Sequence, residues 1–127
     1  RHRPRAVVVY AGDNDLASGV SVDAVVYDVA AFVADLDGLC PVVVLTVKRS
    51  PQRAHIDAAI DALNARFRAF AAVTAGVSVV DVDAPLRRAD GTPDPALFQY
   101  DGLHLNAAGY ARWAAVVKPA LMSIVTH

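Results

Sequence analysis

The sequence predicts an α/β sandwich built on a parallel sheet, and three observations support this prediction. Three short valine-rich runs lack the alternation of half-exposed strands, as is typical of parallel strands buried on both faces. A helical pattern follows each run, so strand and helix alternate along the chain. The chain has 127 residues, of which 55% are hydrophobic. This is enough for one domain with a substantial core, and we expect that domain to cover residues 1–127.

The predicted strands are three apolar runs of similar length. The first is "AVVVYA", residues 6–11, and the second is "PVVVLTV", residues 41–47. The third is "VSVVDV", residues 77–82. Residues 83–95, which are rich in proline and aspartate, predict a long loop after the third strand.

The predicted helices begin at residues that suit helix starts. Residues 22–36 follow Ser21, whose hydroxyl can cap a helix. A second helix follows "SPQR", with Ser50 as a possible cap, and repeats apolar residues every three or four positions through residues 56–70. A third helix begins after Asn106. Strand and helix therefore alternate three times.

Three polar segments fall where the predicted strands end. They are "GDND" (12–15), "KRSPQR" (48–53) and the segment leading into "DGLH" (101–104). In open α/β sheets, ligands bind beyond the carboxyl ends of the strands, so we expect a single site there. The net charge of −1 gives no electrostatic reason to expect a nucleic-acid partner. The apolar runs are far too short to span a membrane.

The "DGLH" segment contains a candidate acid and base. Gly102 favours a turn that brings the Asp101 carboxylate to Nδ1 of His104, which would leave Nε2 free to accept a proton. The alternative is an ordinary Asp-Gly turn in which Asp101 accepts from backbone N–H groups and His104 is merely exposed.

The "GDND" segment contains a candidate oxyanion donor. Gly12 lets the chain turn sharply after the first strand, so that the amide of Asn14 can project over the sheet edge. An ordinary polar turn is the alternative. Asp13 and Asp15 could also join the "DGLH" pair as metal ligands, but their spacing matches no ligand motif. We therefore expect neither a metal nor a cofactor.

Together, "VVVYAGDNDLA" and "LFQYDGLHLNAAGYARWAAVVKPAL" resemble the SGNH hydrolases, also called GDSL esterases and lipases. The resemblance implies a flavodoxin-like three-layer α/β/α sandwich. It also implies a catalytic acid at Asp101, a base at His104, and an oxyanion-hole block that Gly12 and Asn14 match. The implied function is a serine ester hydrolase that acts on a small-molecule ester.

The chain departs from this family at the nucleophile. The family carries its serine in a G-D-S block, whereas the only Gly-Asp pair here is followed by Asn14. Ser18 and Ser50 occupy loops at the correct edge but lack the strand-turn-helix setting that would activate a hydroxyl. We therefore expect the chain, which also lacks an initiating methionine, to be the C-terminal part of an esterase whose serine lies outside it. Its first strand would then pair with the missing N-terminal segment or self-associate.

Two alternative functions stay open at this stage. One is a non-catalytic pseudoenzyme that keeps the fold and has lost the nucleophile. The other is a flavodoxin-like domain that binds a small ligand, although no glycine-rich phosphate loop opens a helix here. By resemblance, four residues are candidates for the acyl pocket, with loop packing as their alternative role. These residues are Leu97, Phe98, Tyr100 and Leu103.

Overall fold

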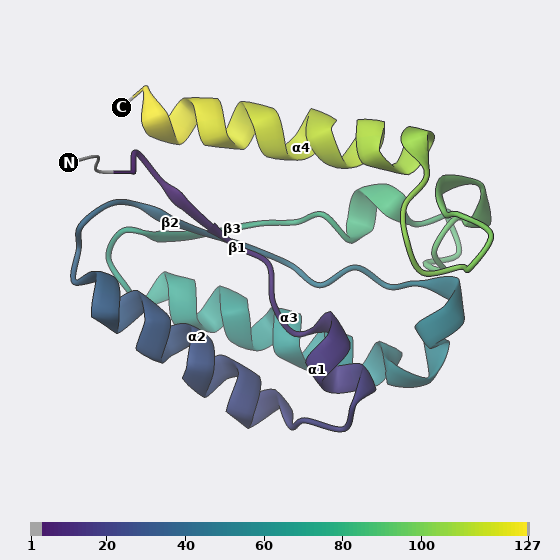
Figure 1. Ribbon diagram of the computed structural model, residues 1–127, viewed down its shortest axis with the longest axis horizontal. Helices are drawn as coiled ribbons and strands as arrows, with labels where there is room; N and C mark the ends of the chain where they lie inside the picture. Colours follow the sequence, from purple (N-terminus) through teal and green to yellow (C-terminus); the bar gives the residue numbers. More distant parts are fainter. Residues whose placement is uncertain (1–3, 127) are drawn as a thin grey trace.

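The computed structural model describes residues 4–126. They form three layers, with one sheet in the middle and helices on either side of it (Figure 1). Strands β1 (Val7–Val9), β2 (Val42–Leu45) and β3 (Val77–Val80) are parallel and lie in the order β1-β2-β3. Each strand lies inside its predicted run, so the three-stranded parallel sheet is confirmed.

Two helices cover one face of the sheet and one covers the other (Figure 1). Helices α2 (Val22–Leu36) and α3 (Asp57–Ala72) lie on one side, and α4 (Ala107–Val125) lies on the opposite side. This is the α/β/α sandwich that the sequence predicts. Within residues 4–126, no helix is both long and apolar enough to cross a bilayer.

The capping predictions are confirmed at two helices and wrong at the third. Ser21 accepts a hydrogen bond from the backbone of Ala24 at the start of α2, and Asn106 caps α4. Ser50 precedes a short 3₁₀ helix, η1 (Pro51–Ile56), which comes before α3, and its side chain makes no cap contact. The Ser50 hydroxyl instead accepts from a buried lysine.

A short helix, α1 (Asp13–Ala17), stands where the sequence suggested only a polar turn. Gly12 precedes it in a left-handed conformation, with φ of 116°. A Cβ on Gly12 would lie 2.5 Å from the Leu63 side chain, so glycine fits this position for reasons of space as well. The turn brings the helix directly over the carboxyl end of β1.

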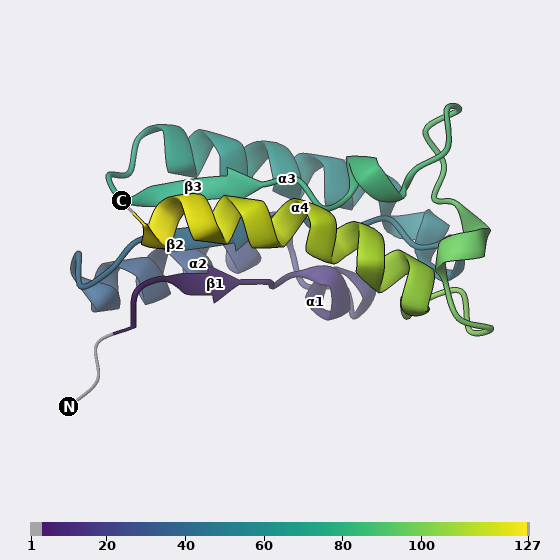
Figure 2. The ribbon, with the colours of Figure 1, turned by 90° about the horizontal axis from the view of Figure 1, so that it is seen from above.

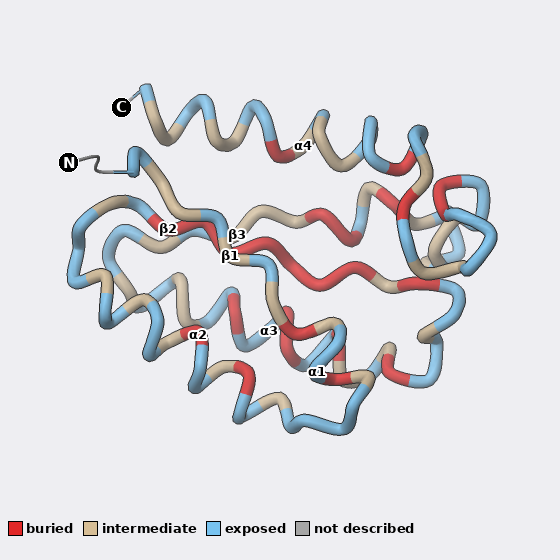
Figure 3. Tube along the Cα trace, in the orientation of Figure 1, coloured by how far each residue is buried: buried red, intermediate tan, exposed pale blue. Residues whose placement is uncertain are grey.

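The core is divided between the two faces of β2, whose residues are all buried (Figure 3). Val42 and Val44 pack with α2 and α3 on one side. Val43 and Leu45 pack with Val117 of α4 on the other. Because successive strand residues point to opposite faces, the unalternated apolar sequence of β2 follows from its coverage on both sides.

β1 forms an edge of the sheet and pairs, among the described residues, with β2 alone (Figure 2). Val8 is 40% exposed and Tyr10, just after the strand, is 45% exposed. The apolar groove beside this edge includes Phe32 of α2. The edge therefore presents unpaired backbone groups and apolar side chains together.

Candidate active site

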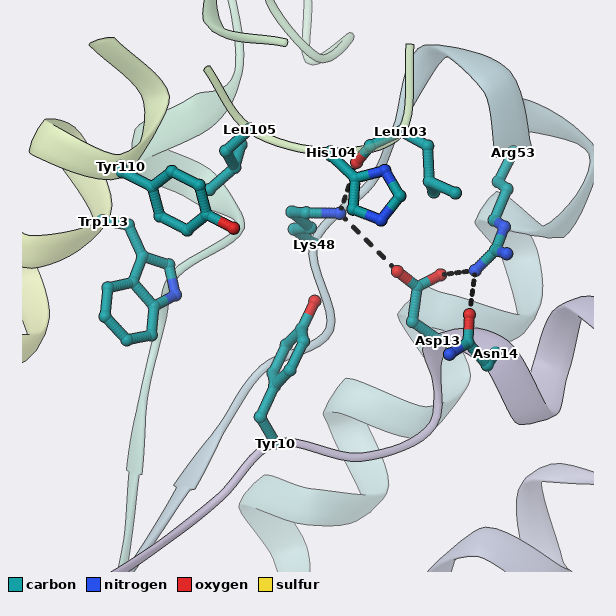
Figure 4. A pocket seen from close by; sticks show the side chains of 10 residues that line it. All are labelled: Tyr10, Asp13, Asn14, Lys48, Arg53, Leu103, His104, Leu105, Tyr110 and Trp113. Carbon is teal, nitrogen blue, oxygen red and sulfur yellow. Dashed lines mark hydrogen bonds and ion pairs between the residues drawn. The ribbon is translucent and has the colours of Figure 1, made fainter. Parts of the chain in front are cut away.

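The three polar segments meet at the carboxyl end of the sheet, where a cleft of about 290 Å³ opens (Figure 4). "GDND" contributes Asp13 and Asn14, and "DGLH" contributes His104. "KRSPQR" contributes Lys48 and Arg53. The structure thus brings residues that are far apart in the sequence around one cavity.

Asp101 and His104 form a hydrogen-bonded pair at the mouth of the cleft. The Nδ1 atom of His104 lies 2.6 Å from Oδ2 of Asp101. The other carboxylate oxygen accepts from the backbone N–H groups of Leu103 and His104, at 2.9 and 3.0 Å. The hydrogen bond from His104, together with these backbone contacts, lowers the pKa of Asp101 from 3.8 to about 2. A charged carboxylate on Nδ1 leaves Nε2 as the basic nitrogen.

Asn14 sits in the first turn of α1 and lines the same cleft as His104. Its Oδ1 atom accepts a hydrogen bond from Nη1 of Arg53 at 3.0 Å. The same guanidinium nitrogen donates to Oδ1 of Asp13 at 2.8 Å. The amide nitrogen of Asn14 is left as a neutral donor, which suits a group that develops negative charge.

Lys48 is a buried cation at the base of the cleft, and sequence reasoning gave it no role. Its ammonium donates to the Ser50 hydroxyl and to the backbone carbonyl of Leu103, each at 3.0 Å. It also lies 3.6 Å from Asp13. Burial lowers the pKa of Lys48 from its ordinary value, and the Asp13 carboxylate opposes this shift. One side chain thus joins all three polar segments.

The opposite side of the cleft is aromatic. Tyr10, from the end of β1, faces Tyr110 and Trp113 of α4, and Leu105 lies beside them (Figure 4). His104 and Lys48 lie between these aromatic rings and the group formed by Asp13, Asn14 and Arg53 (Figure 4). A substrate in this cleft would therefore meet charged groups on one side of the imidazole and ring surfaces on the other.

Of the four residues expected to line an acyl pocket, one lines this cleft. Leu103 lines the cleft, but Leu97 and Phe98 are buried in a separate small core beneath the loop. Tyr100 is fully exposed. The loop needs its own apolar core because it lies beyond the sheet, and Leu97 and Phe98 fill that core. Their packing role, the alternative from the sequence, is the one observed.

The chain has five serines, and none of them lines the cleft. Ser50 is 1% exposed and its hydroxyl accepts from Lys48, so substrate cannot reach it. Ser18 is exposed at the C-terminal end of α1, where its backbone N–H donates to the carbonyl of Asn14, and its side chain does not line the cleft. Over residues 4–126, no group of three or more His, Cys, Asp or Glu side chains is placed to hold a metal ion.

Comparison with known families gives one match that covers most of the chain. Residues 1–112 match the GDSL-like lipase/acylhydrolase family. No curated protein matches the sequence significantly. The matched range includes both the "GDND" and the "DGLH" blocks.

Solved structures with the same fold include esterases and lipases. A GDSL-like lipase from Bacteroides thetaiotaomicron is 26% identical, with a TM-score of 0.79 over 94% of this chain and 63% of its own. A carbohydrate esterase family 3 protein from Talaromyces cellulolyticus is 20% identical, with a TM-score of 0.79 over 97% of this chain and 59% of its own. An acetyl-xylooligosaccharide esterase from Geobacillus is 18% identical, with a TM-score of 0.75 over 98% of this chain and 61% of its own. The chain therefore spans about three fifths of the length of these similar proteins.

Proposed function

We propose that this chain, which belongs to the GDSL-like lipase/acylhydrolase family, provides the acid, the base and one oxyanion donor of a serine ester hydrolase. The observation that carries the proposal is the 2.6 Å contact between Asp101 and His104, at the mouth of a cleft that Asn14 also lines. One transition state must touch both a base and an oxyanion donor, so their shared cleft supports acyl transfer.

The proposed reaction begins when Nε2 of His104 takes the proton of a serine hydroxyl. The serine oxygen then bonds to the ester carbonyl carbon, and the amide nitrogen of Asn14 donates to the resulting oxyanion. The imidazolium returns its proton to the leaving alcohol, which gives an acyl-enzyme. Water, deprotonated by the same imidazole, releases the carboxylic acid. Asp101 stays ionised and stabilises the imidazolium.

The nucleophilic serine, in this proposal, belongs to a segment outside the 127 residues. Support comes from the cleft, which none of the chain's serines lines, and from the similar proteins, of which the chain spans about three fifths. The open edge of β1 is a suitable docking place, because Tyr10 at its end also lines the cleft. A strand paired there would end beside His104.

One observation also favours a second function. A cleft without a serine fits a non-catalytic module that binds an ester or a related small molecule and does not hydrolyse it. The two functions differ in a single measurable property, which is ester turnover by the natural protein.

The test is ester hydrolysis by the chain extended at its N-terminus with a family segment that carries the G-D-S block. We expect hydrolysis of a short-chain chromogenic ester, and a loss of roughly 10²–10⁴-fold in kcat for His104→Ala. His55→Ala, which changes an exposed histidine of η1, is the matched control and should leave kcat unchanged. Full activity in His104→Ala would remove this residue from the mechanism.

A further inference from the structure

We propose that Arg53 is a positioning residue that fixes the orientation of the Asn14 amide, an inference that rests on the proposed function. Arg53 belongs to "KRSPQR", a segment to which the sequence assigned no chemical role. Its Nη1 atom donates to Oδ1 of Asn14 at 3.0 Å and to Oδ1 of Asp13 at 2.8 Å. It is the only side chain with which Asn14 has a hydrogen bond among the described residues.

The direction of the Asn14 amide follows from the chemistry of the guanidinium. An arginine side chain has five N–H donors and no acceptor, so only the oxygen of an amide can face it. The nitrogen of Asn14 must then lie on the other side of the amide, away from Arg53, as Figure 4 shows. Arg53 therefore selects which end of the Asn14 side chain is available to an oxyanion.

Asp13 makes this selection necessary. It is the neighbour of Asn14 and presents a carboxylate to the same cleft, where it could accept from the Asn14 nitrogen and draw that donor away from the substrate. Arg53 occupies one carboxylate oxygen of Asp13 at 2.8 Å, and Lys48 lies 3.6 Å from the other. Both oxygens of the competing acceptor are thus engaged by cations.

Arg53 is itself held in place by the loop that carries the base. The backbone N–H of Gln52 donates to the carbonyl of Gly102 at 3.0 Å, and the N–H of Arg53 donates to the carbonyl of Ser50 at 3.0 Å. The side chain of Arg53 is only 15% exposed. The segment 50–53 therefore connects the His104 loop on one side with Asn14 on the other, which fixes donor and base relative to each other.

The first test measures the amide itself and does not depend on catalysis. The chain has only five side-chain amides, Asn14, Asn64, Asn106, Gln52 and Gln99, so each ¹⁵N–¹H₂ pair can be assigned by substitution. In Arg53→Met we expect the heteronuclear NOE of the Asn14 pair to fall, while those of Asn64 and Asn106 stay unchanged. Arg53→Lys, which keeps a cationic donor, should retain part of the wild-type value. An unchanged Asn14 NOE in Arg53→Met would overturn the inference.

The matched control is Arg66→Met. Arg66 is another arginine paired with an aspartate, Asp23, and lies on α3 away from the cleft. This variant loses an ion pair of the same kind without touching Asn14, so it should leave the Asn14 signal as in the wild type. A fall of the Asn14 NOE in Arg66→Met that matches the fall in Arg53→Met would also overturn the inference.

The second test uses the serine-containing extended protein. Arg53→Met should lower kcat by about tenfold or more, with KM changed by less than about twofold, because the donor acts in the transition state. Asn14→Ala should lower kcat by roughly 10²–10³-fold. The double variant should be no slower than Asn14→Ala alone, since Arg53 acts through Asn14.

The outcomes separate this inference from the proposed function. An inactive wild-type protein would contradict the proposed function, and the amide measurement would still decide whether Arg53 orients Asn14. An active wild type with unchanged kcat in Arg53→Met would contradict the inference alone. The inference would also be contradicted if adding Arg53→Met to Asn14→Ala lowered kcat by the same factor as Arg53→Met lowers it in the wild type. The two residues would then act independently.

Discussion

At the scale of single residues, His104 takes its orientation from a carboxylate that is itself fixed by the backbone. Asp101 accepts from the imidazole with one oxygen and from two backbone N–H groups with the other. Gly102, with φ of 66°, allows the turn that makes all three contacts possible. These three contacts orient the carboxylate, and an ionised carboxylate beside Nδ1 favours the tautomer that carries its proton on Nδ1.

The lowered pKa of Asp101 leads to a prediction at acid pH. The pKa is about 2 in the folded chain and 3.8 ordinarily, so this carboxylate stabilises the fold fully above pH 3.8 and loses that effect as the pH falls towards 2. The difference in urea midpoint between wild type and Asp101→Asn should therefore shrink over this range. Carboxyl NMR should give a pKa near 2, which rises in His104→Ala. A carboxyl pKa that is the same in both proteins would contradict the account.

Sequence reasoning found the contacts that are local in the chain and missed those that are not. Asp101 and His104 are three residues apart, so their pairing follows from the turn between them. The contacts of Lys48 with Leu103 and of Arg53 with Asn14 join residues 55 and 39 positions apart. No spacing predicts such contacts. The sequence signal that could have pointed to Lys48 and Arg53 is the placement of the polar segment 48–53 directly after a buried strand.

At the scale of elements, periodicity predicted the long helices because each has several turns. The helix α1 has five residues, too few to show a repeat, and the sequence therefore suggested a turn. Ser50 looked like a cap because it precedes a proline, but the Lys48 ammonium is buried beside it and uses its hydroxyl. Leaving a buried ammonium without hydrogen-bond acceptors costs more free energy than leaving a helix without one side-chain cap.

The start of α4 gives a prediction about stability. Oδ1 of Asn106 accepts from the backbone of Gly109, and its Nδ2 donates to the carbonyls of Ala96 and Phe98. Asn106→Ala should therefore lower the free energy of unfolding by about 2–3 kcal/mol, since it removes a cap and two further hydrogen bonds. Urea unfolding measures this loss. Ser21→Ala, which removes a cap with one contact, should lower it by about 1 kcal/mol. Equal losses would show that the two carbonyl contacts do not stabilise the loop.

At the scale of the whole molecule, the outer edge of β1, which pairs only with β2 among residues 4–126, lies beside the cleft. Tyr10 belongs to both, because it follows the edge strand and lines the cavity that contains His104. In the proposed function, a partner strand on this edge would cover apolar surface and bring its carboxyl end towards His104. The position of an open edge in the sheet could not be derived from the sequence of the strand, since "VVVY" reads the same for a central or an edge strand.

The most direct measurement of the central claim is labelling with a serine-directed fluorophosphonate probe. The 127-residue chain alone should show no labelling and no ester hydrolysis, because the proposed acid, base and oxyanion donor have no activated hydroxyl beside them. The chain extended with the G-D-S segment should label at the serine of that segment, and His104→Ala should abolish the labelling. Stoichiometric labelling of the chain alone at Ser18 or Ser50 would contradict the account, because the nucleophile would then lie within these residues.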